Sequence, residues 1–249
     1  ACQSPAESPG SPHGESVASS PQLPFQEGSY NVTTSSVDYG AATGYQARPT
    51  TSGDHPGVVL IHEWWGLNDN IRATAEKLAT HGYNVVAVDL YNGTVANTSE
   101  KAQQLSSSVS TDQAMQNLGS AQEYLESQGA SNVASFGFCF GGDQSMQYAV
   151  QEGGPDASVV YYGTPVSNES ALQRLDEPLF GAFGTDDPVV DVDTVRSFEE
   201  SLSNRSGIDI NYYEGAGHAF ANPSGDSFNE GAASDAWNKT LDFLDRSLR

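Results

Sequence analysis

The sequence alternates short apolar runs with segments of helical periodicity, and this alternation limits the chain to one fold class. Residues 58–61 form a continuous apolar run behind Pro56 and Gly57, which is typical of a strand buried on both faces of a sheet. Similar runs predict strands at residues 83–90, 133–138, 157–162, 179–183 and 208–213. Because helical segments separate these strands, the sequence predicts an α/β fold with a mostly parallel central sheet and helices on both faces.

Helical periodicity is clear after the first of these strands. Ile71, Ala75 and Leu78 share one face between Asn68, a capping residue, and Gly82. The same spacing predicts helices at residues 111–129, 144–151 and 192–202 and in the C-terminal segment that holds Trp237, Leu241, Leu244 and Leu248. The Thr-, Tyr- and Val-rich segment 30–47 predicts an antiparallel hairpin at the sheet edge. A single domain over residues 25–249 accounts for all of these elements.

The first 24 residues are rich in Ser and Pro and hold few apolar side chains. Such a segment buries too little surface to offset chain entropy, so we expect a flexible tether over residues 1–24. Cys2 follows a small residue at the head of this tether, as at the processing site of a lipoprotein. This predicts a lipid on Cys2 and an exported protein held at the outer side of the cell membrane. The alternatives are a free cysteine in a disordered tail and a cytoplasmic protein.

The charge balance excludes several classes of partner. The chain has 10 basic and 32 acidic residues, a net charge of -22, so it cannot form the basic face that binds nucleic acid or an anionic membrane. The carboxylates are dispersed along the chain, and their mutual repulsion weakens at high salt, where the Debye length falls to about 3 Å at 1 M. We therefore expect a high-salt environment, with an ordinary acidic surface as the alternative.

Residues 137–142 read Gly-Phe-Cys-Phe-Gly-Gly at the junction between a predicted strand and the following helix. This is the G-x-nucleophile-x-G pattern of a nucleophile elbow, with Cys139 where Ser is usual. The turn directs the sulfur toward a helix N-terminus, which favours the thiolate. The backbone N–H of Phe140 would then face a developing oxyanion. The alternative is a buried structural cysteine beside a tight turn.

Two further groups follow later strands in the chain order of an α/β-hydrolase: nucleophile, acid, histidine. Asp187 comes after the strand at 179–183, and His218 comes after the strand at 208–213. His218 would act as the base, and Asp187 would fix its tautomer and stabilise the imidazolium. The adjacent Asp186 is the alternative acid. The remaining histidines are predicted to be structural or solvated: His13, His55, His62 and His81.

Six sequence words in this order resemble the dienelactone hydrolase family, from about Tyr30 to the C-terminus. They are VVLIHEWWG at 58–66, VDLY at 88–91, GFCFGG at 137–142, YYG at 161–163, GTDDP at 184–188 and GHAFA at 217–221. The resemblance implies the α/β-hydrolase fold and hydrolysis of a carboxylic ester or lactone by a Cys-His-Asp triad. It also implies that Cys139 is the nucleophile, Asp187 the acid and His218 the base.

The resemblance assigns roles to the first of these words as well. Glu63 corresponds to a glutamate that contacts the resting thiol and helps to deprotonate it, and the Trp64 N–H would complete the oxyanion site. Tyr91 would lie beside the pocket. Independently of the family, Glu63 follows a predicted strand and precedes Trp64 and Trp65. We therefore expect it to be desolvated, with a raised pKa.

The substrate pocket departs from the family pattern where the family carries its substrate-binding arginines, and the region after Tyr91 lacks one of them. Asn222 stands just after the His-x-Phe-Ala word, where the dienelactone enzymes carry an arginine that holds the substrate carboxylate. Without that guanidinium we expect a neutral or unusual substrate rather than the anionic dienelactone. The aromatic words predict apolar pocket walls that include Trp65 and Tyr162.

The sequence therefore predicts a monomeric hydrolase of small-molecule esters or lactones. It contains no metal-ligand cluster and no phosphate-binding loop, so we expect no metal and no cofactor. Two alternatives keep the same scaffold: a non-catalytic, lipid-anchored binding or sensor domain, and a thiol-based redox sensor at Cys139.

Overall fold

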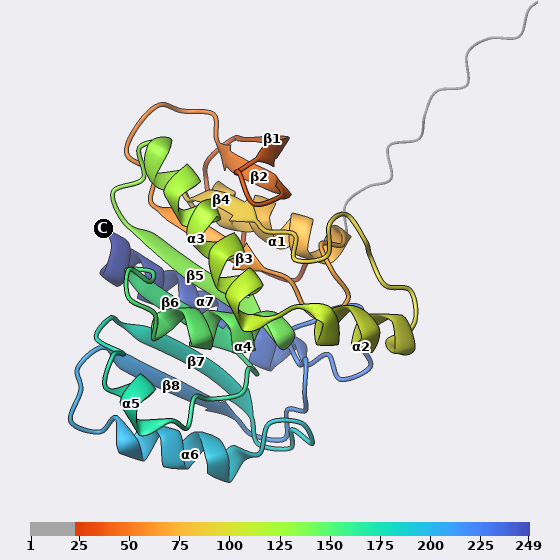
Figure 1. Ribbon diagram of the computed structural model, residues 1–249, viewed down its shortest axis with the longest axis vertical. Helices are drawn as coiled ribbons and strands as arrows, with labels where there is room; N and C mark the ends of the chain where they lie inside the picture. The colour runs from red at the N-terminus through yellow and green to blue at the C-terminus, as the bar shows by residue number, and fades with distance from the viewer. Residues whose placement is uncertain (1–22) are drawn as a thin grey trace, which may run out of the picture.

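A computed structural model describes residues 23–249, and its centre is one eight-stranded sheet with the order β1-β2-β4-β3-β5-β6-β7-β8 (Figure 1). The strands are β1 (Val32–Asp38), β2 (Thr43–Pro49), β3 (Gly57–Ile61), β4 (Asn84–Ala87), β5 (Val133–Phe138), β6 (Ala157–Tyr161), β7 (Leu179–Gly184) and β8 (Ile208–Tyr213). The β1–β2 and β2–β4 pairs are antiparallel, and every other pair is parallel. The predicted mostly parallel sheet, with an antiparallel hairpin at its edge, is confirmed.

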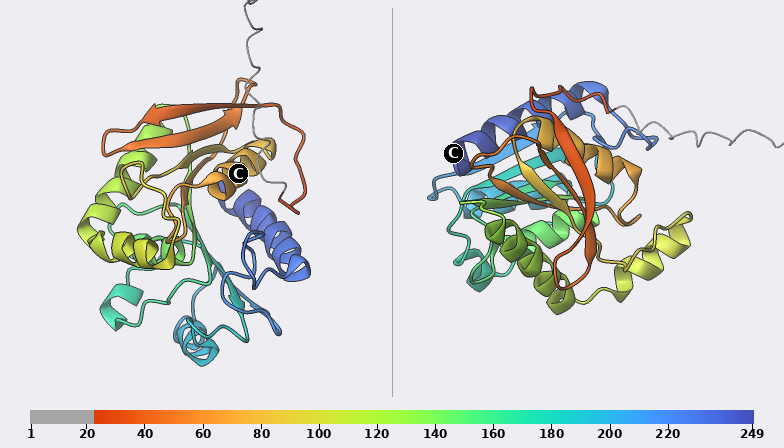
Figure 2. Two further views of the ribbon diagram at one scale, coloured as in Figure 1. Left: turned by 90° about the vertical axis from the view of Figure 1, so that its right-hand side faces the viewer. Right: turned by 90° about the horizontal axis from the view of Figure 1, so that it is seen from above.

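The helices lie on both faces of this sheet, as predicted. They are α1 (Asp69–Thr80), α2 (Ser99–Ser108), α3 (Thr111–Ser127), α4 (Phe140–Ala149), α5 (Glu169–Leu172), α6 (Val192–Ser201) and α7 (Glu230–Leu248). The buried residues of α1 and α7 pack on one face, and those of α3, α4 and α6 pack on the other (Figure 2).

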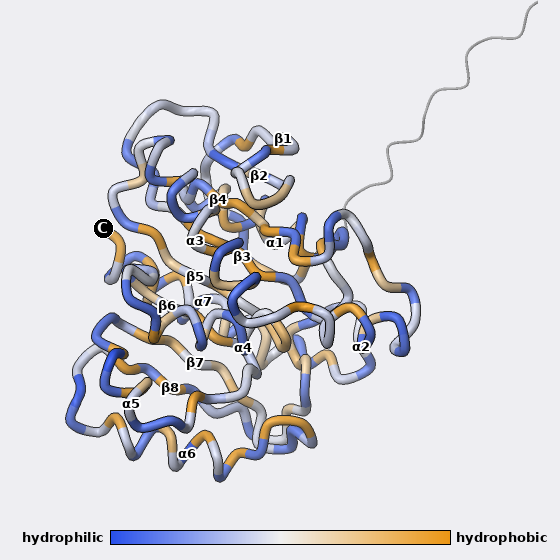
Figure 3. The backbone as a smooth tube through the Cα atoms, in the orientation of Figure 1, coloured by the Kyte–Doolittle hydropathy of each residue, from blue (hydrophilic) through white to orange (hydrophobic). Residues whose placement is uncertain are grey.

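Alternate residues of β3 point to these two opposite cores. Val58 and Leu60 pack with α1 and α7, whereas Val59 and Ile61 pack with α3, and all of them are fully buried. This two-sided burial explains why β3 is a continuous apolar run rather than an alternating one. Figure 3 shows the apolar strands in the centre of the molecule, inside the more polar helices.

Four elements differ from the sequence prediction. β4 covers only Asn84–Ala87 of the strand predicted at 83–90. α2 was not predicted, because Ala102 is its single buried residue and the segment therefore lacks an apolar stripe. α5 is only four residues long, too short for a periodic pattern. α4 begins at Phe140 rather than at residue 144, because the glycines after Cys139 continue the helix instead of preceding it.

The packing of the domain begins earlier than the predicted boundary at residue 25. Leu23 and Phe25 are both buried, and the Phe25 ring stacks on Trp237 of α7 with 4.5 Å between ring centroids. The backbone N–H of Gly28 donates to Thr80 Oγ1 at 2.9 Å. We call residues 23–28 the N-terminal strap. Residues 1–22, including Cys2 and its predicted lipid, lie outside the described part of the chain.

Candidate active site

Cys139 occupies the sharp turn between β5 and α4. Its φ of 53° lies in the left-handed region, and its backbone N–H donates to Tyr161 O at 3.0 Å. A Cβ at position 137 would collide with the carbonyl of Gly141, and a Cβ at 141 would collide with the carbonyl of Ile61. Both glycines are therefore required for the backbone to turn this tightly, and the turn holds Cys139 at the N-terminus of α4.

Two loops from later strands bring their side chains to this sulfur. His218, after β8, has Nε2 at 3.0 Å from Cys139 Sγ, and its Nδ1 lies 2.8 Å from Asp187 Oδ2, after β7. The Val189 and Val190 backbone N–H groups donate to Asp187 Oδ1 at 2.7 and 3.0 Å. Cys139, His218 and Asp187 thus form one continuous chain of hydrogen bonds.

The neighbouring Asp186 takes no part in this chain of hydrogen bonds. Asp186 is exposed, and its Oδ1 accepts from Thr185 Oγ1 at 3.3 Å. The Asp187 side chain, in contrast, is 1% exposed and contacts the histidine directly. Of the two adjacent carboxylates that the sequence left open, Asp187 is the one that reaches His218.

The hydrogen bonds of His218 with Asp187 and Cys139 favour the protonated form of the histidine. Burial alone would lower the pKa of His218, but hydrogen bonds to Asp187 and Cys139 and the negative charge of the sulfur raise it to about 10. Burial also opposes ionisation of Asp187, yet the hydrogen bonds from His218, Val190 and Val189 lower its pKa below the ordinary value. We therefore expect a charged His218 in the resting protein, hydrogen-bonded to the Asp187 carboxylate on one side and to the Cys139 sulfur on the other.

Glu63 lies at the start of the loop that follows β3, and it is buried with 5% of its surface exposed. Burial raises the pKa of Glu63 to about 7, although a hydrogen bond from Asn222 and the charge of His218 act in the opposite direction. Its Oε2 accepts from Asn222 Nδ2 at 2.6 Å. The thiol contact that the resemblance implied is not formed within the described residues, since Cys139 Sγ contacts His218 instead.

Asn222 is itself held by neighbours that the sequence did not single out. Its Oδ1 accepts from Asn70 Nδ2 at 3.2 Å and from the Ser224 N–H at 2.9 Å. Asn70 Nδ2 also reaches Ser224 Oγ at 2.9 Å. Because both donors occupy the amide oxygen, the Asn222 NH₂ group is left to face Glu63. Asn70 is separated from Asn222 by 152 residues, so no local pattern could indicate this contact.

His62 has the structural role that the sequence predicted. It is fully buried, its Nε2 accepts from the Leu90 N–H at 3.2 Å, and its Nδ1 therefore donates to Glu63 O at 2.6 Å. Burial lowers the pKa of His62, so the ring stays neutral in this tautomer. His62 thus joins the loops after β3 and β4 and fixes the backbone of Glu63.

Two backbone N–H groups, at the start of α4 and in the loop packed against it, have no hydrogen-bond acceptor within residues 23–249. They belong to Phe140, the first residue of α4, and Trp64, next to Glu63. The close approach of Gly141 to the carbonyls of Ile61 and His62 brings their two segments together. Free N–H groups at a helix N-terminus are suited to stabilising a developing oxyanion.

The predicted pocket aromatics lie around these groups. Tyr162 has its ring centroid 5.3 Å from that of His218, and Tyr91 packs on Phe140 at 5.8 Å. Trp65 packs on Trp64 at 5.1 Å and is partly exposed, with no hydrogen bond or ring contact to Cys139 or His218 in the described structure. Tyr162 therefore lies beside His218 and Tyr91 beside Phe140 of the elbow, whereas Trp65 contacts Trp64.

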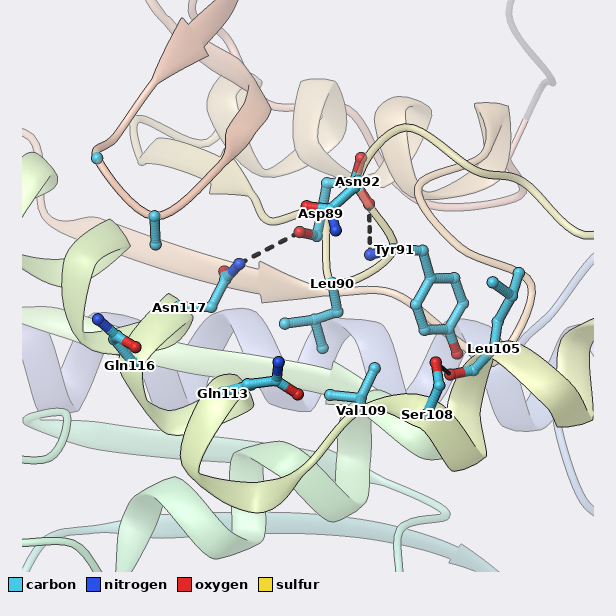
Figure 4. A pocket seen from close by; sticks show the side chains of 12 residues that line it. Asp89, Leu90, Tyr91, Asn92, Leu105, Ser108, Val109, Gln113, Gln116 and Asn117 are labelled. Carbon is cyan, nitrogen blue, oxygen red and sulfur yellow. Dashed lines mark hydrogen bonds between the residues drawn. The ribbon is translucent and has the colours of Figure 1, made fainter.

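Tyr91 also lines a cavity of about 630 Å³ between the loop after β4 and the α2–α3 junction (Figure 4). Its polar walls include Gln113, Gln116 and Asn117, but neither Cys139 nor His218 lines it. The side-chain amide of Asn117 already has hydrogen-bond partners in the protein. Its Nδ2 donates to Asp89 O at 3.2 Å, and its Oδ1 accepts from the Tyr39 hydroxyl at 2.8 Å. This cavity adjoins the cysteine site without containing it.

The described residues hold no group of three or more metal-ligating side chains. They also include no helix that is both long enough and apolar enough to cross a membrane.

Comparison with known proteins gives similarity over most of the chain. The family model described as "Dienelactone hydrolase family" matches residues 42–248. A protein of Saccharolobus solfataricus, by name a candidate carboxymethylenebutenolidase, is 30% identical over 228 residues, covering 76% of this chain and 88% of its own. Carboxymethylenebutenolidase 1 of Cupriavidus pinatubonensis is 29% identical over 212 residues, covering 80% and 89%. The crystal structure of a candidate dienelactone hydrolase from Klebsiella pneumoniae superposes with a TM-score of 0.79 at 24% identity, over 87% of this chain and 99% of that one.

Proposed function

This chain belongs to the dienelactone hydrolase family, and we propose that it hydrolyses a neutral carboxylic ester or lactone with Cys139 as the nucleophile. Family membership confirms the predicted α/β-hydrolase fold and hydrolase class. The observation that supports the nucleophile is the row of hydrogen bonds from Cys139 through His218 to Asp187.

The first half of the proposed reaction forms a thioester. The Cys139 thiolate adds to the substrate carbonyl carbon, and the oxyanion accepts hydrogen bonds from the N–H groups of Phe140 and Trp64. As the intermediate collapses, the bond from carbon to the alkoxy oxygen breaks. The His218 imidazolium gives its proton to that oxygen, which leaves as an alcohol, or remains tethered as a hydroxyl if the substrate is a lactone.

The second half releases the acid. Neutral His218 takes a proton from a water molecule, whose oxygen adds to the thioester carbonyl. Collapse of this intermediate breaks the carbon–sulfur bond and returns the thiolate to Cys139 beside the protonated His218. The buried Asp187 keeps Nδ1 of the ring as the donor through both halves, so that Nε2 always faces the sulfur.

Glu63 supports the charge of His218 in this scheme. In its ionised form the buried carboxylate attracts the imidazolium, which favours the reactive thiolate. Since the pKa of Glu63 is about 7, we expect kcat/KM to rise with pH through that range.

Glu63→Gln is therefore expected to remove this rise and to lower kcat/KM at pH 8 by about tenfold, the equivalent of one pKa unit of lost stabilisation. The measurement is a pH profile of kcat/KM for both proteins. Glu76→Gln on α1 is the matched control, because Glu76 contacts Tyr45 and lies outside the site. An unaltered rise near pH 7 in Glu63→Gln would contradict the assigned role.

The neutral substrate is supported by the charges around the site. Asn222, an uncharged amide, faces Glu63, and the net charge of the chain is -22. A substrate carboxylate would thus meet no guanidinium at this position and would be repelled by the surface.

The reaction is tested with p-nitrophenyl acetate, a neutral lactone, and the same lactone bearing a carboxylate, each assayed at high salt. Turnover of the two neutral compounds, with a lower kcat/KM for the carboxylate-bearing one, is expected. No turnover of any of them, combined with thermal stabilisation by the lactone, would instead indicate the non-catalytic binding domain.

High salt is also part of the proposal, because the 32 acidic residues repel one another unless they are screened. The melting temperature in thermal unfolding should rise by several degrees between dilute buffer and about 1 M KCl. Sucrose at equal osmolarity serves as an uncharged control. A melting temperature that does not depend on salt would leave an ordinary acidic surface as the explanation.

A further inference from the structure

A narrow cavity of about 20 Å³ lies beside Glu63, and part of its wall comes from the N-terminal strap. Leu23 and Phe25 line it together with Glu63, Tyr162 and Asn222. Its volume is about that needed for one water molecule, so it cannot receive the acyl part of a substrate.

The strap makes ring and polar contacts with α7 and with the C-terminal end of α1. Phe25 stacks on Trp237 with an angle of 7° between the rings. Next to it, His81 Nε2 lies 2.9 Å from Gln26 O, and Glu27 pairs with Lys77 Nζ at 2.5 Å. Leu23 itself makes no polar contact within the described structure and is 6% exposed. The family model matches residues 42–248, so the strap lies outside the region that this model matches.

We propose that the strap is part of the active site, and that Leu23 and Phe25 are positioning residues that exclude water from the Glu63 carboxyl group. The proposal rests on the role of Glu63 in the proposed function. It extends the site to a segment that comes before the region matched by the family model. It also assigns an apolar wall of the site to residues outside the catalytic motifs.

The groups that face Glu63 come from several elements. His218 approaches from the loop after β8, and Tyr162 follows β6, with a phenol that burial keeps neutral by raising its pKa. Asn222 donates to the carboxylate, and Asn70 of α1 supports Asn222. The strap contributes only apolar groups here, since its single charged residue, Glu27, lies at the surface with Lys77. His218 is therefore the one cation among these neighbours, and removal of the apolar wall would admit water without adding charge.

Leu23→Asn tests the proposal, because it keeps a side chain of similar length and adds groups that bind water. The titration of Glu63 is followed by carboxyl ¹³C NMR in the full chain, with its signal assigned by its loss in Glu63→Gln. The midpoint is expected to fall by about one pH unit toward the ordinary glutamate value. The rise of kcat/KM assigned to Glu63 should move to lower pH by the same amount. In a Leu23→Asn, Glu63→Gln double variant, no such movement should occur.

Gln26→Ala is the matched control, because Gln26 belongs to the strap, is exposed and does not line the cavity. It should leave the Glu63 midpoint unchanged. Leu23→Ala offers a second test if Leu23→Asn does not fold. An unmoved midpoint in a folded Leu23 variant would overturn the proposal. The NMR titration needs no substrate, so it distinguishes failure of the strap proposal from failure of the proposed hydrolase activity.

Discussion

Cys139→Ala is expected to lower kcat for hydrolysis of p-nitrophenyl acetate by at least about 10³-fold. The reason is that no other nucleophile among the described residues touches His218 Nε2 in this structure. The oxyanion N–H groups and the substrate pocket would remain, so the residual rate would be that of a positioned substrate attacked by water. The measurement is a comparison of steady-state rates for the wild type and the variant at the same salt concentration.

The fold should survive this substitution. Alanine removes one sulfur atom, and the positive φ at position 139 is already tolerated by a residue with a Cβ. Equal melting temperatures within a few degrees would establish that the rate loss is chemical. Cys139→Ser, which retains a weaker nucleophile, is the second variant and should fall between the two. A Cys139→Ala protein that keeps most of its rate would eliminate Cys139 as the nucleophile.

His218→Gln should lower kcat by about 10⁴-fold. Glutamine can neither give a proton to the leaving oxygen, as the imidazolium does, nor take one from water, as the neutral ring does. The same residue acts in both halves of the reaction, so both acylation and deacylation slow down. Kinetics of the wild type and His218→Gln are measured with His55→Gln as the control, since the hydrogen bonds of His55 go to the carbonyls of Gly82 and Thr51, outside the site.

Non-additivity gives this second prediction a sharper form. If Cys139 and His218 act as a unit, the Cys139→Ala, His218→Gln double variant should be hardly slower than the slower of the two single variants. Multiplication of the two losses would mean that the residues act independently, and it would contradict the proposed proton transfer between Nε2 and Sγ.

The fold was largely predictable because its strands have a strong local signal. β3 and β5 are buried on both faces, so nearly every residue in them is apolar or small. α2 was missed for the opposite reason: it buries only Ala102, and a helix that packs so little needs no apolar stripe. The elbow was predictable for a different reason. Any side chain at position 137 or 141 would collide with backbone, so the turn requires glycine there and the requirement is visible in the sequence.

The site was predictable where each residue follows the end of a parallel strand. Such ends meet at one edge of the sheet, and Cys139, Asp187 and His218 could be placed together on that ground. Asn70 and Leu23 could not, because their contacts with the Glu63 region depend on tertiary packing across long stretches of chain. The partner of Glu63 was also not predictable, because the side chain of Asn222 is directed by Asn70 and Ser224.

The central claim is that a thioester forms on Cys139 during turnover. The most direct measurement is peptide mass mapping after the protein is mixed with p-nitrophenyl acetate and quenched within the first turnover. We predict one acetyl group on the peptide that contains Cys139 in the wild type and none on that peptide in Cys139→Ala. Turnover of the ester without any acyl group on Cys139, or with the acyl group on another residue, would contradict the account.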